Sequence, residues 1–196
     1  MVSIMPACGK CPERLCVLPA LVLAVLLSAC GNQPEGGQFE LSGVEASWSN
    51  GRMEVRFEQD LKLSPEARNA LVHGVPLTVG VELVLRDAQS RTRVKKNQSY
   101  YEIRYLPLSE HYQLSGPDDE NVQTFPRLRH ALAELDSLEV SFDTGALPSG
   151  EYELLARSFL DKRKMPPPMR LPVMFSPRWK HQSAWTSSQL EIEPGA

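Results

Sequence analysis

Apolar and polar residues alternate between Val75 and Leu85, and this alternation limits the chain to a small set of folds. Every odd position in the stretch is apolar, and the even positions include Thr78 and Glu82. Successive side chains of a β-strand point to opposite faces of the sheet, so the spacing predicts a strand with one face in a core. An amphipathic helix would instead repeat its apolar positions every three to four residues. The stretch therefore indicates a half-buried β-sheet.

Shorter stretches of the same period predict further strands along the chain. They are Met53–Phe57, Tyr101–Tyr105, Leu138–Phe142, Tyr152–Leu160 and Leu171–Phe175. Asn50-Gly51 lies between Phe39–Trp48 and the first of them, which is typical of a tight hairpin turn. Repeated half-buried strands with few helices predict an all-β fold, an antiparallel β-sandwich that is Ig-like in general architecture. An open barrel of similar strands is the alternative.

Two short helices are expected between the strands. Ser64 is a suitable N-cap, Pro65 suits the first helical position, and Gly74 can end the helix in a left-handed turn. A second helix is predicted over residues 126–135, where the apolar side chains form one stripe.

The first thirty residues have the pattern of an export signal. Lys10 and Arg14 precede an apolar run from Val17 to Leu27, and a basic start followed by a short apolar core is typical of a secretory signal peptide. The run leads into Ser28-Ala29-Cys30 and there resembles the lipobox of bacterial lipoproteins. We therefore predict cleavage before Cys30 and attachment of lipid to its sulfur. A free cysteine after cleavage, or an uncleaved N-terminal anchor, are the alternatives.

These signals divide the chain into four parts. Residues 1–29 are the predicted signal peptide, 30–37 the lipidated cysteine and a flexible tether, 38–185 the β-sandwich domain, and 186–196 a tail. The glycine-rich tether reaches on the order of 15 Å, so the domain is expected to stay close to the membrane. Gly31 follows the cysteine, and the resemblance to lipoproteins implies sorting to the outer membrane, because their usual signal for the inner membrane is Asp at that position. We therefore predict a lipid anchor in the outer membrane, facing the periplasm, with the inner membrane as the alternative.

Processing also decides the roles of the cysteines. Cys8, Cys11 and Cys16 would leave with the signal peptide, so no metal is expected at their closely spaced positions. Cys30 would carry lipid, which leaves no pair of cysteines for a disulfide. The domain must then depend on its hydrophobic core for stability.

The charge of the chain argues against nucleic acid as a partner. The full sequence has 21 basic and 24 acidic side chains, and the part from Cys30 onward has 19 and 23, a net charge of −4. Domains that bind nucleic acid normally present a basic field. The expected partners are the membrane, through the N-terminal lipid, and an envelope protein.

Motifs that carry catalysis or hold a cofactor are missing from the sequence. It has no G-x-S-x-G elbow, P-loop, dinucleotide-binding glycine pattern or H-E-x-x-H. No cofactor is therefore expected, and the acidic residues 118–120 are interpreted as a solvated turn rather than a calcium loop. One alternative is an enzyme acting on envelope polymers, with Asp161, Asp143 or Glu102 as acid–base groups. Another is a carrier that holds an apolar ligand inside the sandwich.

The segment from Lys162 to Arg170 is the main candidate for a partner surface. It joins a basic triplet to a run of prolines, and its candidate residues are Lys162, Arg163, Pro166, Pro167, Pro168 and Arg170. Three consecutive prolines predict an extended, rigid loop that a partner can bind with little ordering cost. A stiff crossover between strands is the alternative.

Two other groups of residues are interpreted as structural. Arg91, Arg93 and Lys95 share one face of a predicted strand, with Lys96 beside them. They are predicted to guard an edge strand with charge, with a site for anionic head groups or for an acidic partner as the alternative. Trp179 and Trp185 are expected to cover the open end of the sandwich rather than to bind a ligand.

A possible groove is the last candidate. Its lining residues would be Arg104, Tyr105, Tyr112, Asp161 and Arg170. Buried tyrosines and an Asp–Arg ion pair explain the same residues as structure.

Several short stretches, in a fixed order, make this chain resemble a known family. They are residues 70–77 (ALVHGVPL), 103–109 (IRYLPLS) with Tyr112, Phe125 with Ala131-Leu132, Leu160-Asp161, residues 166–171 (PPPMRL), and Trp179 with Ser183 and Trp185. On these residues the chain is identified as a member of the domain of unknown function 4390 family of exported proteobacterial proteins, here in a lipoprotein version. Met165 and Met169 stand where leucine is expected. The resemblance implies export and a single small domain, associates the chain with a sensor kinase, and supplies no catalytic residues.

The sequence thus predicts a non-catalytic binding or accessory module in the periplasm. Its expected role is that of a scaffold, an assembly factor or an accessory to a sensor kinase.

Overall fold

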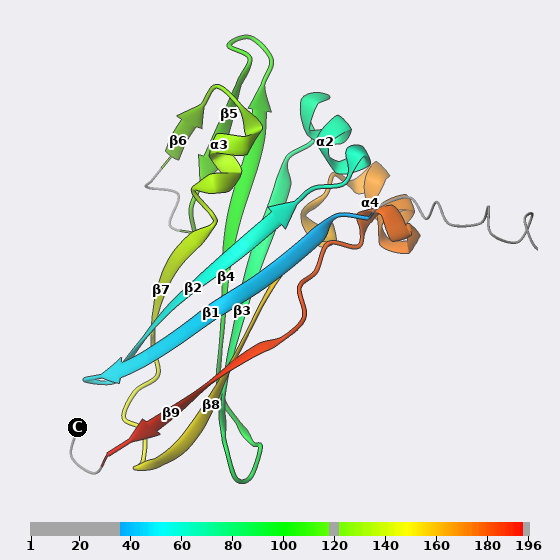
Figure 1. Cartoon of the computed structure of the whole chain (residues 1–196). Helices are drawn as coiled ribbons and strands as arrows, with labels where there is room; N and C mark the ends of the chain where they lie inside the picture. Colours follow the sequence, from blue (N-terminus) through cyan, green and yellow to red (C-terminus); the bar gives the residue numbers. More distant parts are fainter. Residues whose placement is uncertain (1–35, 118–121, 194–196) are drawn as a thin grey trace, which may run out of the picture. The chain divides into compact units, whose positions relative to one another are not determined.

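The described part of the chain is an antiparallel β-sandwich of two sheets (Figure 1). The computed structural model describes residues 36–117 and 122–193. The smaller sheet has the strand order β1-β2-β7, and the larger has the order β6-β5-β4-β3-β8-β9. The strands are β1 (Gln38–Ser49), β2 (Arg52–Lys62), β3 (Leu77–Asp87), β4 (Arg93–Leu106), β5 (His111–Ser115), β6 (Val122–Phe125), β7 (Ser137–Asp143), β8 (Gly150–Leu160) and β9 (Thr186–Ile192). This confirms the predicted all-β sandwich.

The core lies between the sheets and is filled by the alternating apolar positions. In β2 the side chains of Met53, Val55 and Phe57 are buried, and the residues between them are exposed. In β3 the odd positions from Leu77 to Leu85 are fully buried, as predicted. The core residues of the described chain all lie between Phe39 and Ile192, and residues 36–196 form one compact unit. This unit therefore holds the core formed by residues 36–117 and 122–193.

Asn50 and Gly51 make the turn of the β1–β2 hairpin, which confirms the predicted Asn-Gly turn. Their φ values are 50° and 81°, and a two-residue turn that matches the strand twist needs positive φ at both positions. The turn sets Trp48 opposite Met53. This register places one face of β2 in the core.

The two predicted helices are present, and both are short. Helix α2 (Pro65–Val72) begins after Ser64, whose hydroxyl accepts a hydrogen bond from the backbone N–H of Ala67 at 3.1 Å. Gly74 follows the helix with a φ of 87°, as expected for a left-handed end. Helix α3 (Leu128–Ala133) lies within the predicted range. No helix in residues 36–117 or 122–193 has the length and apolar character needed to cross a membrane.

A third helix, α4 (Pro167–Phe175), corrects two of the sequence predictions. Residues 162–170 are not one extended loop, because Lys162–Lys164 form a short 3-10 helix, η1, and the proline run leads into α4. Pro167 and Pro168 occupy the first turn of α4, where a backbone N–H has no partner within the helix and proline is tolerated. The predicted strand at Leu171–Phe175 is also wrong, since this segment is helical and buries Val173.

The predicted tail from residue 186 is part of the larger sheet. Strand β9 pairs with β8 from Ala156↔Thr186 to Gly150↔Ile192, and Ile192 is buried. The sandwich therefore extends beyond the predicted boundary at residue 185. Serine, threonine and glutamine dominate the first part of β9, which hid the strand pattern because an edge strand needs few apolar residues.

Candidate functional site

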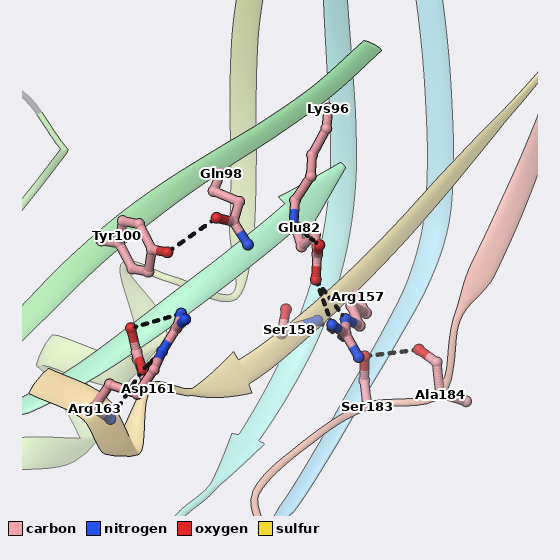
Figure 2. Close-up of polar contacts among 10 residues, drawn as sticks. All are labelled: Glu82, Lys96, Gln98, Tyr100, Arg157, Ser158, Asp161, Arg163, Ser183 and Ala184. Atoms are coloured by element: carbon pink, nitrogen blue, oxygen red, sulfur yellow. Dashed lines mark hydrogen bonds and ion pairs between the residues drawn. The ribbon is translucent and has the colours of Figure 1, made fainter. Parts of the chain in front are cut away.

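A charged cleft of about 430 Å³ lies on the outer face of the larger sheet, away from the core. The register sets Glu82 of β3 directly opposite Gln98 of β4 on one side and Arg157 of β8 on the other. The outward-facing side chains of three neighbouring strands therefore meet at one place (Figure 2). We call this site the basic cleft, after its charged lining residues Lys96, Arg157, Lys162, Arg163 and Lys180, with Glu82 and Asp161.

Glu82 is the buried acidic centre of the basic cleft. Its side chain is 6% exposed and forms an ion pair with Lys96 Nζ at 2.5 Å. It also accepts hydrogen bonds from Arg157 Nε at 2.8 Å and from Arg157 Nη2 at 2.5 Å. Burial by itself raises the pKa of Glu82, but the hydrogen bonds from Lys96 and Arg157 outweigh it and hold this pKa below its usual value. The carboxylate therefore stays ionised and paired with Lys96 and Arg157.

Asp161 is the second buried carboxylate of the basic cleft, and it caps η1. One carboxylate oxygen accepts hydrogen bonds from the backbone N–H of Arg163 at 3.0 Å and from its Nε at 3.1 Å. Figure 2 shows Asp161 and Arg163 beside the Glu82 group. These contacts give Asp161 a structural role at the end of β8.

The other two carboxylates considered for acid–base chemistry lie outside the basic cleft. Glu102 is paired with Arg104 at 2.7 Å on β4. Asp143 is exposed at the end of β7 in the smaller sheet, where it accepts a hydrogen bond from the backbone of Gly145 at 2.8 Å. Each of these two carboxylates is therefore paired with a residue two positions further along the chain.

The basic cleft carries an excess of positive charge on an acidic domain. Five basic side chains line it against two carboxylates, and both carboxylates are already paired with arginine or lysine. Burial lowers the pKa of Lys162, and the nearby charge of Lys180 acts in the same direction. The crowding of like charges is typical of a site that receives an anionic group.

The structure assigns only part of the predicted partner surface to the basic cleft. Lys162 and Arg163 line it, whereas Pro166, Pro167 and Pro168 do not. Arg170 instead donates a hydrogen bond from Nε to the backbone carbonyl of Met165 at 2.8 Å.

Sequence reasoning missed Arg157 and Lys180, and it noted Lys96 only as a neighbour of the predicted edge-strand row. Lys96, Arg157 and Lys180 come from β4, from β8 and from the segment after the 3-10 helix η2 (Pro177–Trp179). The pairing of β4 and β8 with β3 brings Lys96 and Arg157 together, and the return of the chain alongside β8 adds Lys180. The one available signal was Arg157, a charged residue that alternates with the buried positions of β8.

A return of the chain alongside β8 completes the wall of the basic cleft. The Leu160 N–H donates to the His181 carbonyl at 2.9 Å, and the Ser183 N–H donates to the Ser158 carbonyl at 2.9 Å. The hydroxyl of Ser158 donates to the side-chain carbonyl of Gln59 on β2. This polar link joins the cleft wall to the smaller sheet.

His181 is a buried wall residue of the basic cleft. Its Nε2 accepts a hydrogen bond from the backbone N–H of Ser64 at 2.9 Å, and its ring meets Phe39 edge-on with centroids 5.5 Å apart. The hydrogen bond to Nε2 requires a neutral ring. Burial lowers the pKa of His181, and the charge of Lys162 acts in the same direction.

We expect His181 to make the stability of the domain depend on pH. An unfolded imidazole titrates near the ordinary pKa of 6.5, and the folded ring titrates below it. Between the two pKa values the unfolded chain binds more protons than the folded chain. The contribution of neutral His181 to the free energy of unfolding is therefore fully present above about pH 6.5, and it falls on acidification by at most about 1.4 kcal/mol per pH unit. Urea unfolding at several pH values should show a smaller acid loss for His181→Gln, which keeps an acceptor for Ser64.

The control for this prediction is His130→Gln, which changes an exposed histidine on α3. It should retain the pH dependence of the unaltered domain. An equal acid loss in His181→Gln and the unaltered domain would contradict the role of His181.

The other sequence candidates have structural roles. Arg91 lies in the β3–β4 turn rather than on the predicted strand, and it pairs with Glu153 at 3.1 Å. Residues 93–101 of β4 lie outside the pairing with β5, which covers Glu102–Leu106, so Arg93 and Lys95 lie on an edge, as predicted. The sites at residues 118–120 and at Cys30 lie outside the described residues.

The predicted groove around Arg104 does not contain the expected Asp–Arg pair. Asp161 pairs with Arg163, and Arg170 contacts a backbone carbonyl. The rings of Tyr105 and Tyr112 pack together with centroids 5.0 Å apart.

The two tryptophans differ in their environments. Trp179 is buried in the core, which agrees with the structural interpretation. Trp185 is 43% exposed, and its ring lies 4.4 Å from the guanidinium of Arg157. Trp185 therefore steadies a basic side chain of the cleft through a cation–π contact.

The fold and the site define the protein as a small β-sandwich domain with a basic cleft on one sheet. The chain belongs to the family described as Domain of unknown function (DUF4390), whose profile matches residues 37–189. No curated protein and no solved structure matches the chain. Among residues 36–117 and 122–193, no group of three or more His, Cys, Asp or Glu side chains is placed to hold a metal.

Proposed function

We propose that this protein is a non-catalytic binding module of the bacterial envelope. A lipid on Cys30 holds it on the outer membrane, facing the periplasm, and its basic cleft binds an acidic group of an envelope protein. Such binding suits a scaffold, an assembly factor or an accessory to a membrane sensor. The export pattern of residues 1–30 supports the location, and the cleft supports the mode of binding.

The observation that carries this proposal is the unmatched positive charge of the basic cleft. Glu82 and Asp161 are paired within the cleft, whereas Lys162 and Lys180 line it and form no ion pair within residues 36–117 and 122–193. Burial lowers the pKa of Lys162, and the positive charge of Lys180 lowers it further. An acidic group of a partner would relieve this repulsion. The net charge of the whole chain is −3, so the cleft is also the place to which an acidic partner would be steered.

The buried carboxylates favour binding over catalysis. A general acid or base must exchange a proton near the working pH. The lowered pKa of Glu82 and its pairing with Lys96 and Arg157 keep it ionised instead. The carrier alternative is also disfavoured, because the side chains of Phe57, Met53 and other large residues fill the space between the sheets.

The test is binding of a short polyglutamate peptide to residues 36–196, followed by backbone amide NMR. We expect shifts at Lys96, Arg157 and Lys162. The double variant Lys162→Glu/Lys180→Glu should weaken binding by at least about tenfold, because two attractive charges become repulsive.

The matched control is Arg127→Glu/Arg129→Glu, which changes the net charge equally on exposed residues at α3. It should bind like the unaltered domain. Equal loss in both double variants, or shifts confined to other surfaces, would contradict a specific anionic site. Capture of an envelope protein that depends on Lys162 and Lys180 would identify the partner.

A further inference from the structure

Helix α4 exposes an apolar ridge instead of burying one. Leu171 is 68% exposed and Phe175 is 81% exposed, whereas Val173 is 2% exposed. Leu171 and Phe175 are four residues apart, so they lie on one side of the helix, and Pro168 lies on the same side one turn earlier. We call Pro168, Leu171 and Phe175 the apolar ridge; it faces away from the side that Val173 packs into the domain.

Exposure of this kind identifies a contact surface. A short surface helix normally turns its apolar side chains inward and its polar side chains to water. In α4 Val173 and Met169 pack toward the core, whereas Leu171 and Phe175 are exposed. A contiguous apolar surface is typical of a site that meets a membrane or another protein. Solvation of this ridge has a free-energy cost that a partner would remove.

The charge around the apolar ridge selects an anionic, apolar partner. From Lys162 to Leu190 the sequence contains six lysines and arginines and no aspartate or glutamate. Lys164, Arg170, Arg178 and Lys180 are exposed around α4. Arg178 is paired with Glu66 of α2 at 3.3 Å. Arg170 donates from Nε to the Met165 carbonyl, Lys164 Nζ lies 5.0 Å from the centroid of the Tyr100 ring, and Lys180 lines the basic cleft. Apolar side chains bordered by cations are the pattern of a helix that lies in the interface of an anionic bilayer.

The start of the domain lies beside α4. Gly36 packs closely against the backbone that follows α4. A Cβ atom added to Gly36 would lie 3.3 Å from the Pro177 carbonyl oxygen and 3.6 Å from the Lys180 carbonyl oxygen. Pro177 is only two residues beyond Phe175. Figure 1 shows the beginning of β1 next to α4.

The length of chain before Gly36 limits how far α4 can be from the lipid. Residues 31–35 separate Cys30 from Gly36, and even a fully extended chain covers about 20 Å over this distance. If Cys30 carries the lipid, as the proposed function states, the apolar ridge is held near the membrane surface. Tethering gives a weak contact a high effective concentration, so a short ridge is sufficient.

We propose that α4 is a membrane-contact helix. The apolar ridge enters the boundary between head groups and acyl chains, and Lys164, Arg170 and Lys180 meet the phosphates of anionic lipids. This contact would orient the domain and hold the basic cleft at the membrane surface, since Met174 of α4 lines the cleft. The cleft would then select acidic groups that lie close to the bilayer.

The test uses a tryptophan placed on the apolar ridge. Residues 30–196 contain Cys30 as the sole cysteine, so the protein can be coupled through it to a maleimide lipid in vesicles that contain phosphatidylglycerol. Phe175→Trp is compared with Leu108→Trp, which changes a fully exposed residue between β4 and β5. Quenching by lipids with brominated acyl chains reports contact with the membrane.

We expect the tryptophan introduced by Phe175→Trp to lose about half or more of its fluorescence to the brominated lipids. The tryptophan introduced by Leu108→Trp should remain at the background of the native tryptophans. Equal quenching in the two variants would overturn the proposal. A spectral change in Phe175→Trp that depends on protein density, without quenching by bromine, would also overturn it and indicate contact between two copies.

The chemical coupling separates this inference from the proposed function. The vesicle experiment supplies the lipid, so its result does not depend on whether the cell acylates Cys30. The proposed function is tested separately, by measuring how the Lys162→Glu/Lys180→Glu variant binds the polyglutamate peptide without vesicles. A failure of either proposal is therefore visible without a failure of the other.

Discussion

Cys30→Ala is expected to move the protein from the membrane fraction to the soluble fraction of the envelope almost completely. Two or three acyl chains hold a protein stably on a bilayer, and the variant lacks the thiol at position 30 that is predicted to receive the first of them. No helix in the described ranges has the length and apolar character needed to cross a membrane. The contact through α4 is weak without a tether, so washing with salt should remove what remains bound.

Cys16→Ala is the matched control for this prediction. It removes a cysteine within the predicted signal peptide and leaves Cys30 in place. This variant should stay in the membrane fraction. Retention of Cys30→Ala after a salt wash would contradict the lipid anchor and favour an uncleaved N-terminal segment.

Phe57→Ala is expected to lower the free energy of unfolding by about 3–5 kcal/mol. Phe57 is the largest of the fully buried side chains at the centre of β2. Its removal loses the transfer free energy of the ring and leaves a cavity between the sheets. Residues 36–196 contain no cysteine, so no disulfide within this unit offsets the loss.

The control for Phe57→Ala is Phe175→Ala on the apolar ridge. Phe175 is 81% exposed, so its removal should change stability by less than about 0.5 kcal/mol. Urea unfolding of residues 36–196 measures both variants. Similar losses in the two variants would show that Phe175 is packed against the domain in solution, contrary to the structure and to the proposed membrane contact.

The strands were predictable wherever one face of the sheet is buried. In β2 and β3 the apolar residues repeat every second position, because each strand has one side in the core. Asn50-Gly51 specifies a turn with positive φ at both positions, so the first hairpin could be placed to the residue. Ser64, Pro65 and Gly74 marked both ends of α2 for similarly local reasons.

Helix α4 and strand β9 were not predictable by the same rules. Leu171, Val173 and Phe175 alternate like a strand, but only Val173 is buried, and the prolines at 167 and 168 start a helix instead of preventing one. In β9 an edge position removes the need for a continuous apolar face. In α4 and β9 most side chains contact solvent or are available to a partner. Burial in the core therefore does not set their sequence pattern.

The basic cleft shows why a site is harder to predict than a fold. Lys162 and Arg163 attracted attention as neighbours in sequence, whereas Lys96 and Arg157 join them only through the pairing of β4 and β8 with β3. Glu82 looked like an ordinary exposed position of an alternating strand. Its burial follows from the long side chains that fold over it from both neighbouring strands.

The central claim is that Cys30 carries lipid and thereby places the sandwich on the envelope membrane. The most direct test is the intact mass of the protein extracted from membranes. We predict a chain that begins at Cys30, with a mass increased by the attached acyl groups. A chain that still begins at Met1, or that begins at Cys30 without added hydrocarbon, would contradict the account.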